Sequence, residues 1–279
     1  MIVLSRLQAL PLLEARKQGR DAAVTSLDLN RTQSEVRLEA AGVVFPDGRR
    51  LSWQEIEEIE QGEGVCFAVT EAGIEKIQFF SPARNRFYSL LSTELAPTML
   101  LSGFPMHRIK GIDPQEDTQR KIRTIAPIIG RVLDVCTGLG YTAIAAAETA
   151  ARVTTIELDP TVLEVARRNP WSQALFENPR ITQIVGDASE RIEEFEDAAF
   201  ARIFHDPPTF SLAGELYSGA FYRQLFRVLA RGGRLFHYIG DLESASGSSV
   251  AKGAARRLQD AGFTKVARRP EAFGLVAYK

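Results

Sequence analysis

The stretch "VLDVCTGLGYT", Val132 to Thr142, decides how this chain is interpreted. Its apolar first half predicts a buried strand, and the small-residue run "AIAAAETAA" that follows predicts a helix. Gly138 and Gly140 stand at the junction, where the absence of a Cβ atom permits a tight turn and a close approach to a ligand. The next helix would direct its N-terminal N–H groups at that ligand. We therefore expect a ligand-binding turn here.

The glycine pair by itself is weak evidence, because many strand–helix turns need glycine only for packing. The loop lacks the third glycine of the dinucleotide fingerprint and the Lys-Ser/Thr pair of a phosphate-binding loop. Both of those ligand classes are therefore disfavoured, and the other strand ends have to decide what binds.

From about Met106 onward, apolar β-like runs alternate with helical patterns up to the final run "FGLVAYK". This alternation predicts an α/β domain, residues 106–279, with a mostly parallel sheet covered on both faces. Residues 1–105 have strand-like alternation, a hairpin pattern around Glu71–Gly73 and a short helix after Ser52, with Glu55 three residues later. They predict a small α+β module, with substrate docking as one role suggested by its position.

Composition excludes several classes of protein. The formal net charge of −1 argues against a chain that binds nucleic acid through its overall charge. Cys66 and Cys136 lie far apart without metal-ligand spacing, so we expect no metal site and a reducing, cytoplasmic location. The first apolar stretch is interrupted by Arg6 and Gln8 and is too short to span a bilayer, so we expect no membrane partner.

Four successive predicted strands end in a carboxylate: Asp134, Glu157, Asp187 and Asp206. Ligands of open α/β sheets bind at the carboxyl ends of the strands. Glu157 follows the glycine loop by about 20 residues, the spacing at which a carboxylate accepts hydrogen bonds from both hydroxyls of a ribose. Asp187 is placed to reach an adenine amino group. One acidic strand end is a common result of helix capping, but four beside a glycine loop predict a nucleoside site.

The segments "LDVCTGLGYTA", "IELDP", "VGDAS" and "HDPPTF" resemble the successive motifs of class I S-adenosylmethionine-dependent methyltransferases, which have a Rossmann-like domain. The resemblance is closest to an archaeal-type group with a DPP motif and spermidine-synthase-like relatives, marked by "MHRIKGIDPQEDT" and "HDPPTFSLAGELYS". It implies that S-adenosylmethionine is the cofactor. The cofactor-binding residues that it implies run from the methionine part through the ribose to the adenine: Asp134, Thr137, Gly138, Gly140, Glu157, Leu158, Asp187 and Ala188.

"HDPPTF", His205 to Phe210, resembles the Asp/Asn-Pro-Pro-aromatic motif of enzymes that methylate exocyclic base amines or amide nitrogens. Such a nitrogen is a poor nucleophile, because its lone pair is conjugated into the ring. Asp206 and the carbonyl of Pro207 would accept its N–H bonds and align the lone pair with the methyl group. Pro207 and Pro208 would stiffen the turn, and Phe210 would stack on the base, although Thr209 occupies the usual aromatic position. His205 is a better active-site candidate than His237, and Tyr217 is expected on the substrate side.

The leading hypothesis is methylation of an exocyclic amine in RNA, with cytidine N4 of rRNA as the expected target. The HDPPTF motif supports this hypothesis. A second support is the C-terminal segment 251–279, which has an excess of about five positive charges and could bind phosphates. The alternatives are a small-amine methyltransferase and a spermidine-synthase-like aminopropyltransferase. A degenerate, non-enzymatic subunit has the least support, and a homodimer stays open as the assembly.

Overall fold

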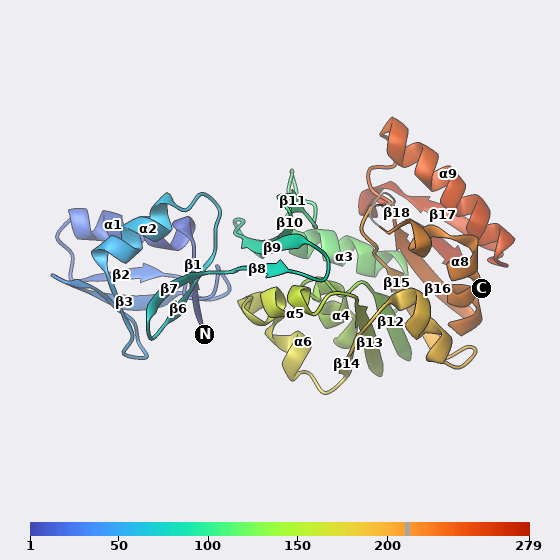
Figure 1. Cartoon of the computed structure of the whole chain (residues 1–279), viewed down its shortest axis with the longest axis horizontal. Helices are drawn as coiled ribbons and strands as arrows, with labels where there is room; N and C mark the ends of the chain where they lie inside the picture. The colour runs from blue at the N-terminus through green and yellow to red at the C-terminus, as the bar shows by residue number, and fades with distance from the viewer. Residues whose placement is uncertain (210–212) are drawn as a thin grey trace. The chain divides into compact units, whose positions relative to one another are not determined.

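The computed structural model describes residues 1–209 and 213–279 (Figure 1). The chain divides into two compact units. Unit 1 comprises Met1–Gln115 together with Thr161–Gln173, and unit 2 comprises Glu116–Pro160 together with Ala174–Lys279. These units differ from the sequence-based boundary at 105/106, because the compact first unit extends further along the chain and includes a later segment. The functional division at 105/106 stays a prediction.

Unit 2 is built on one seven-stranded sheet with the order β14-β13-β12-β15-β16-β18-β17. Every neighbouring pair from β14 to β16 is parallel, and β18 runs antiparallel to both of its neighbours. The strands are β12 (Arg131–Val135), β13 (Arg152–Glu157), β14 (Ile181–Val185), β15 (Phe200–His205), β16 (Leu229–Tyr238), β17 (Lys265–Arg269) and β18 (Gly274–Tyr278). The prediction of a mostly parallel α/β sheet is therefore confirmed.

Helix α3 (Pro114–Thr124) precedes β12, and further helices follow in the connections between the strands, as the alternating pattern predicted. The connecting helices are α4 (Tyr141–Ala147), α5 (Pro160–Arg167), which belongs largely to unit 1, α6 (Gln173–Glu177), α7 (Ala188–Arg191), α8 (Gly219–Val228) and α9 (Ala245–Asp260). Helix α4 packs against β12 and β13, whereas α8 and α9 pack against the β16–β18 part of the sheet (Figure 1). After the exposed Arg131, strand β12 is buried and apolar except for Asp134, as expected for a central parallel strand.

The main core of unit 2 lies between the sheet and these helices. Leu133 and Leu235 contribute from the strands, and Phe221 and Leu225 contribute from α8. Helix α8 presents its apolar residues at spacings of three and four, so one face is buried against the sheet. Because this core fixes the strand positions, it also fixes the edge of the sheet at which the parallel strands end.

Unit 1 contains three small sheets, all antiparallel within their ladders. Their strands are β1 (Ile2–Leu4), β6 (Phe67–Thr70) and β7 (Gly73–Lys76); β2 (Ala22–Thr25), β3 (Ser34–Glu39), β4 (Gly42–Val44) and β5 (Arg50–Ser52); and β8 (Gln78–Ser81), β9 (Arg86–Leu91), β10 (Thr98–Leu101) and β11 (Phe104–Pro105). Two helices, α1 (Arg6–Lys17) and α2 (Trp53–Gln61), accompany them.

Two sequence predictions in unit 1 are confirmed. Helix α2 begins with a capping box, in which the Ser52 side chain accepts from the Glu55 N–H and the Glu55 side chain accepts from the Ser52 N–H. The helix ends at Gly62. The hairpin around Glu71–Gly73 forms between β6 and β7. Local capping and turn chemistry therefore specify these elements well.

Candidate active site

The glycine turn joins β12 to α4 through a backbone that is left-handed at three positions. Cys136, Gly138 and Gly140 have φ angles of +72°, +55° and +77°. A Cβ atom on Gly140 would lie 2.7 Å from the side chain of Leu175, whereas one on Gly138 would meet nothing within 4 Å. Gly140 is therefore required by packing inside the protein, and Gly138 leaves open space beside the backbone.

Glu157, at the end of β13, holds the glycine turn. Its Oε2 atom accepts a hydrogen bond from the Gly138 N–H at 2.9 Å, and its Oε1 atom accepts from the Asp159 N–H at 3.2 Å. Burial raises the pKa of Glu157, and these backbone donors oppose that rise. Each oxygen of the Glu157 carboxylate thus accepts one backbone hydrogen bond, and the side chain positions the glycine turn. Leu158, which follows it, is exposed.

Asp134, on β12, is a buried carboxylate of the site. Its Oδ2 atom accepts from the Thr155 hydroxyl at 2.7 Å, and Thr155 lies 2.6 Å from the hydroxyl of Thr137. Its Oδ1 atom is buried and has no hydrogen-bond partner among the described residues. Burial raises the pKa of Asp134 to about 7. A buried acceptor without a partner is an observation that fits a ligand carrying a charged amino group.

Asp187 lies at the end of β14, but its side chain has a local task. It caps α7 by accepting from the Ser189 N–H at 2.8 Å, and the Ser189 hydroxyl donates to it at 2.6 Å. Ala188 is buried at the start of that helix. The contact of these two residues with an adenine stays a prediction.

Asp206 follows β15 and forms an ion pair that the sequence analysis missed. The Nζ atom of Lys121, on α3, lies 2.7 Å from Asp206 Oδ2 and 3.0 Å from Asp117 Oδ2. The Lys121 side chain is 4% exposed and that of Asp206 is 24% exposed. The ammonium also lies 4.7 Å from the ring centre of Tyr238. The spacing of Asp117 and Lys121, one helical turn apart, was the only sequence signal for this arrangement.

The charges of this ion pair oppose the effect of burial. The Asp206 and Asp117 carboxylates raise the pKa of Lys121 above its ordinary value, so this buried amine remains an ammonium at neutral pH. Burial raises the pKa of Asp206, and the Lys121 ammonium counteracts that rise. Asp206 is thus a carboxylate with one oxygen held by a cation and a side chain that solvent partly reaches.

Two hydrogen bonds hold the Pro-Pro turn after Asp206 in place. The Tyr217 hydroxyl donates to the Pro208 carbonyl at 3.0 Å, and the Asp206 N–H donates to the Val135 carbonyl at 3.3 Å. Pro207 is buried, as is Tyr217. The expectation that Tyr217 faces the substrate is therefore wrong, because its ring supports the turn from the core.

Phe210, the predicted stacking residue, lies outside the described residues. His205 is fully buried, and its ring centre lies 4.4 Å from that of His237. Its Nε2 atom is 2.9 Å from the Leu216 carbonyl, and burial lowers its pKa to about 4. His205 is therefore a neutral packing residue, which corrects its expected role in the active site.

Only part of the basic C-terminal segment is available to a ligand. Arg257 and Lys279 donate to the backbone carbonyls of Tyr217 and Phe226 at 2.8 and 2.6 Å. Lys252 is exposed on α9. The segment is therefore partly a structural element rather than a free basic surface.

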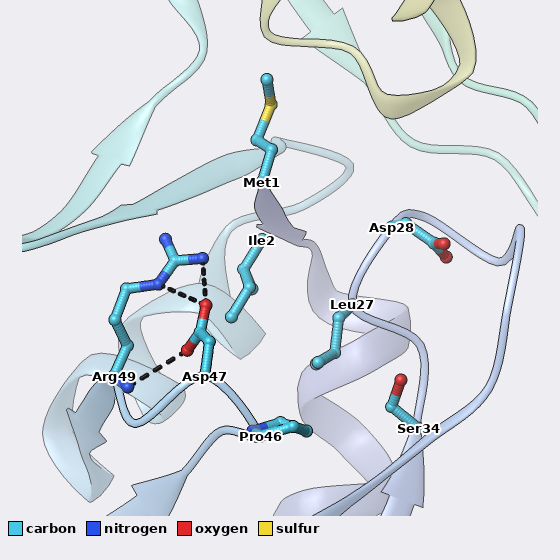
Figure 2. Close-up of a pocket in the computed structure, with 8 residues that line it drawn as sticks. All are labelled: Met1, Ile2, Leu27, Asp28, Ser34, Pro46, Asp47 and Arg49. Atoms are coloured by element: carbon cyan, nitrogen blue, oxygen red, sulfur yellow. Dashed lines mark hydrogen bonds and ion pairs between the residues drawn. The ribbon is translucent and has the colours of Figure 1, made fainter.

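Two hollows lie outside the strand ends. One belongs to unit 1, has a volume of about 240 Å³ and contains the Asp47–Arg49 hydrogen bonds (Figure 2). The other, in unit 2, has a volume of about 500 Å³. Its lining consists of charged side chains and one threonine: Glu116, Arg120, Arg123, Thr124, Arg269 and Glu271.

Among the described residues, no three His, Cys, Asp or Glu side chains gather in a way that would hold a metal ion. None of the helices in the described ranges is long and apolar enough to cross a membrane.

Comparison with known proteins identifies the fold and the enzyme class. Residues 132–233 match the model of the family described as "Methyltransferase domain". A solved structure of spermidine synthase, in complex with the transition-state analogue AdoDATO, has the same fold, with a TM-score of 0.61 and 18% identity. That alignment covers 72% of this chain and 71% of the other. The chain is thus a class I S-adenosylmethionine-dependent methyltransferase, and S-adenosylmethionine is its cofactor.

The particular family follows from a relative of nearly the same length. Uncharacterized protein MJ1233 of Methanocaldococcus jannaschii is 42% identical over 260 residues, which cover 91% of this chain and 88% of the relative. The chain belongs to the family of that protein. Polyamine aminopropyltransferase 2 of Streptomyces coelicolor is 32% identical over 99 residues, which cover 33% of this chain and 18% of the relative.

Proposed function

We propose that this enzyme methylates a neutral exocyclic amine of an RNA base, with cytidine N4 of rRNA as the first candidate. The observation that carries the proposal is the buried Lys121 ammonium 2.7 Å from Asp206 Oδ2. An amine that hydrogen-bonds to the other oxygen of Asp206 would lie within about 5 Å of this cation. For a protonated amine the repulsion by Lys121 amounts to about 3 kcal/mol at an effective dielectric constant of about 20, which offsets part of the attraction to the Asp206 carboxylate. A neutral base amine avoids that cost.

The cofactor part of the site is assigned by the geometry of the strand ends. Asp134, Thr137, Gly138 and Gly140 would hold the methionine part, because Gly138 leaves open space and Asp134 has a buried acceptor. The ribose and the adenine would be contacted from the ends of β13 and β14. The residues at these two ends are Glu157, Leu158, Asp187 and Ala188.

S-adenosylmethionine supplies a methyl group made electrophilic by the sulfonium to which it is bonded. The Asp206 carboxylate and the Pro207 carbonyl would accept the two N–H bonds of the base amine and direct its lone pair at this carbon. Transfer would form the N–C bond as the C–S bond breaks, and the electron pair of the C–S bond would remain on sulfur. The extra proton leaves the nitrogen for Asp206, whose pKa burial raises, and passes on to water.

Phosphate binding has support from the arginine-lined hollow of unit 2. Arg120, Arg123 and Arg269 line it together with two glutamates. Guanidinium groups bind phosphate oxygens with two parallel hydrogen bonds, which suits a nucleic-acid backbone. This hollow and the exposed basic side chains of α9 would position an RNA strand without reading its sequence.

A small-amine substrate is the second candidate, because one segment of the chain is similar to a polyamine aminopropyltransferase. In that case the nitrogen would attack an aminopropyl or a methyl group. A polyamine is protonated at neutral pH, so it would have to lose a proton beside Lys121 before it could react.

The test measures transfer of the radiolabelled methyl group from S-adenosylmethionine to two substrates in parallel reactions. One substrate is total RNA from a strain lacking the protein, and the other is a pool of small amines. Nucleosides are then separated and identified by mass spectrometry. We expect label in a methylated base amine, and little or none with Asp206→Ala, which removes the acceptor of the amine. Label confined to the amine pool would overturn the RNA assignment.

A further inference from the structure

The β8–β9 hairpin of unit 1 exposes two phenylalanines that face one another across the strands. Phe80 and Phe87 are direct partners in the antiparallel ladder, and their ring centres lie 4.8 Å apart with the planes tilted by 46°. They are 44% and 51% exposed. Two large aromatic rings in contact on adjacent strands, each about half exposed, form an apolar surface patch. Such a patch requires an explanation, because exposed apolar patches often mark interaction sites.

These rings do not belong to the core of their sheet. Side chains alternate between the faces of a strand, so Phe87 lies on the face opposite to Tyr88. Tyr88, Leu90 and Met99 are buried on that other face. The buried residues of this sheet therefore lie on one face, and the Phe80–Phe87 pair lies on the other face.

The turn that joins the two strands carries positive charge, because Arg84 is exposed at its tip. Arg86, the first residue of β9, pairs with Ser81 and by the same alternation belongs to the face of Tyr88, opposite to Phe87. Neither guanidinium forms an ion pair or a hydrogen bond within the described part of the chain. Asn85 adopts the left-handed conformation, with a φ angle of +50°, and turns the chain back into the strand beside the aromatic pair.

We propose that this hairpin is a docking surface for single-stranded RNA, in which a base stacks on Phe80 and Phe87 while Arg84, at the tip of the hairpin, binds a flanking phosphate. Flat aromatic rings bind bases of any sequence, and a cationic side chain beside them supplies the charge complementarity to the backbone. A purely apolar partner would leave Arg84 without a counter-charge. The proposal rests on the RNA substrate proposed above and names the part of the chain that would hold it.

The experiment is fluorescence anisotropy of labelled oligo(U) with the full chain, the double variant Phe80→Ala/Phe87→Ala and the control Phe104→Ala. Phe104 is 73% exposed in the same sheet, but it pairs with Leu101, which pairs with Tyr88, so it lies on the opposite face. We expect the double variant to weaken binding by about tenfold to a hundredfold, and the control to stay within about twofold.

A second variant tests the charge. Arg84→Gln should reduce the slope of log affinity against log salt by about 0.7, the contribution of one phosphate contact on a single strand. The control is Arg37→Gln, an exposed arginine on β3. An unchanged slope in the Arg84 variant, with binding by the native chain intact, would overturn the assignment of Arg84 and with it the proposed surface.

The outcomes separate this inference from the proposed function. If the native chain labels RNA and the double phenylalanine variant binds oligo(U) equally well, the docking surface is wrong and the enzyme assignment stands. If that variant instead changes only the sedimentation mass, the surface joins two copies and the inference is overturned. If the native chain neither binds oligo(U) nor labels RNA, both proposals fail together, whereas label in RNA without oligo(U) binding overturns this one alone.

Discussion

Two neighbouring strands of the same sheet, β12 and β15, end in turns built from opposite kinds of residue. β12 continues into a loop with left-handed backbone at Gly138 and Gly140, and β15 continues into Pro207 and Pro208. Glycine lets the backbone approach a ligand, whereas proline fixes the direction of its carbonyl groups. Under the proposed mechanism the first turn contacts the cofactor and the second holds the reacting nitrogen, so each end needs the backbone property that it has.

The carboxylates of these two ends differ in their surroundings as well. Asp134 is buried beside Thr155 and has a pKa of about 7, whereas Asp206 is partly exposed and held by the Lys121 ammonium. The same residue type at the same edge thus has a different charge behaviour, because burial outweighs the hydrogen bond from Thr155 at Asp134, whereas a cation in direct contact counteracts burial at Asp206. Changes at either end should separate the two roles.

The largest effect is expected from Asp206→Ala. Methyl transfer should fall by about 100-fold to 1000-fold, because the nitrogen loses the acceptor that orients it. The Kd for S-adenosylmethionine, measured by calorimetry, should change by less than about threefold. Loss of cofactor binding would show that this strand end belongs to the cofactor side and would remove the distinction drawn here.

Lys121→Met should change both the pH dependence and the choice of substrate. Without the ammonium the pKa of Asp206 rises further, so the acidic limb of kcat/KM moves to higher pH. The ratio of kcat/KM for a protonated amine to that for RNA should rise by up to about 100-fold, which corresponds to the removed repulsion of about 3 kcal/mol.

The matched control for that variant is Lys17→Met, an exposed lysine of α1, which should leave both quantities unchanged. Circular dichroism checks that Lys121→Met folds. An acidic limb at the native pH in the folded variant would contradict the role given to the ion pair.

The two glycines should respond differently to alanine. Gly140→Ala brings a Cβ atom to 2.7 Å from Leu175 and should lower the free energy of unfolding by about 2 kcal/mol or more. Gly138→Ala carries only the backbone cost of about 1 kcal/mol but fills the space proposed for the cofactor. Its Kd for S-adenosylmethionine should rise by about tenfold, measured beside denaturant unfolding. Equal loss of stability in both would contradict the packing difference.

The last change concerns the pH dependence of stability rather than catalysis. The pKa of Asp134 is raised from about 3.8 to about 7 on folding, so the native state binds the extra proton between these values. Its contribution to stability is complete at low pH and declines as pH rises toward about 7, by at most about 1.4 kcal/mol per pH unit. Asp134→Asn should flatten this decline in urea unfolding from pH 4 to 8. A decline as steep as that of the native chain would place its origin in other groups.

Short-range patterns were enough to predict many elements of this molecule. The apolar run before Cys136 and the helical pattern after Tyr141 predicted β12 and α4, because hydrophobic periodicity follows directly from strand and helix geometry. The capping box of Ser52 and Glu55 predicted α2 in the same local way. The position of Asp134 near the end of β12 was predicted in the same way, from the apolar run that contains it.

Other features were decided only by tertiary packing. Lys121 and Asp206 are 85 residues apart, and nothing in either local segment states that α3 meets the end of β15. His205 was ranked above His237 as an active-site candidate because it adjoins Asp206, yet β15 is buried on both faces and the His205 ring packs among aromatic side chains.

The sequence by itself therefore determined the alternating fold and the row of strand-end carboxylates, because both depend on residues close together in the chain. The tertiary structure decided how those carboxylates behave. It gave Asp206 a cation, left Asp134 an acceptor without a partner in the described structure, and left Phe80 and Phe87 outside their own core. The charge and exposure of a side chain are set by neighbours that only the packed fold brings into contact.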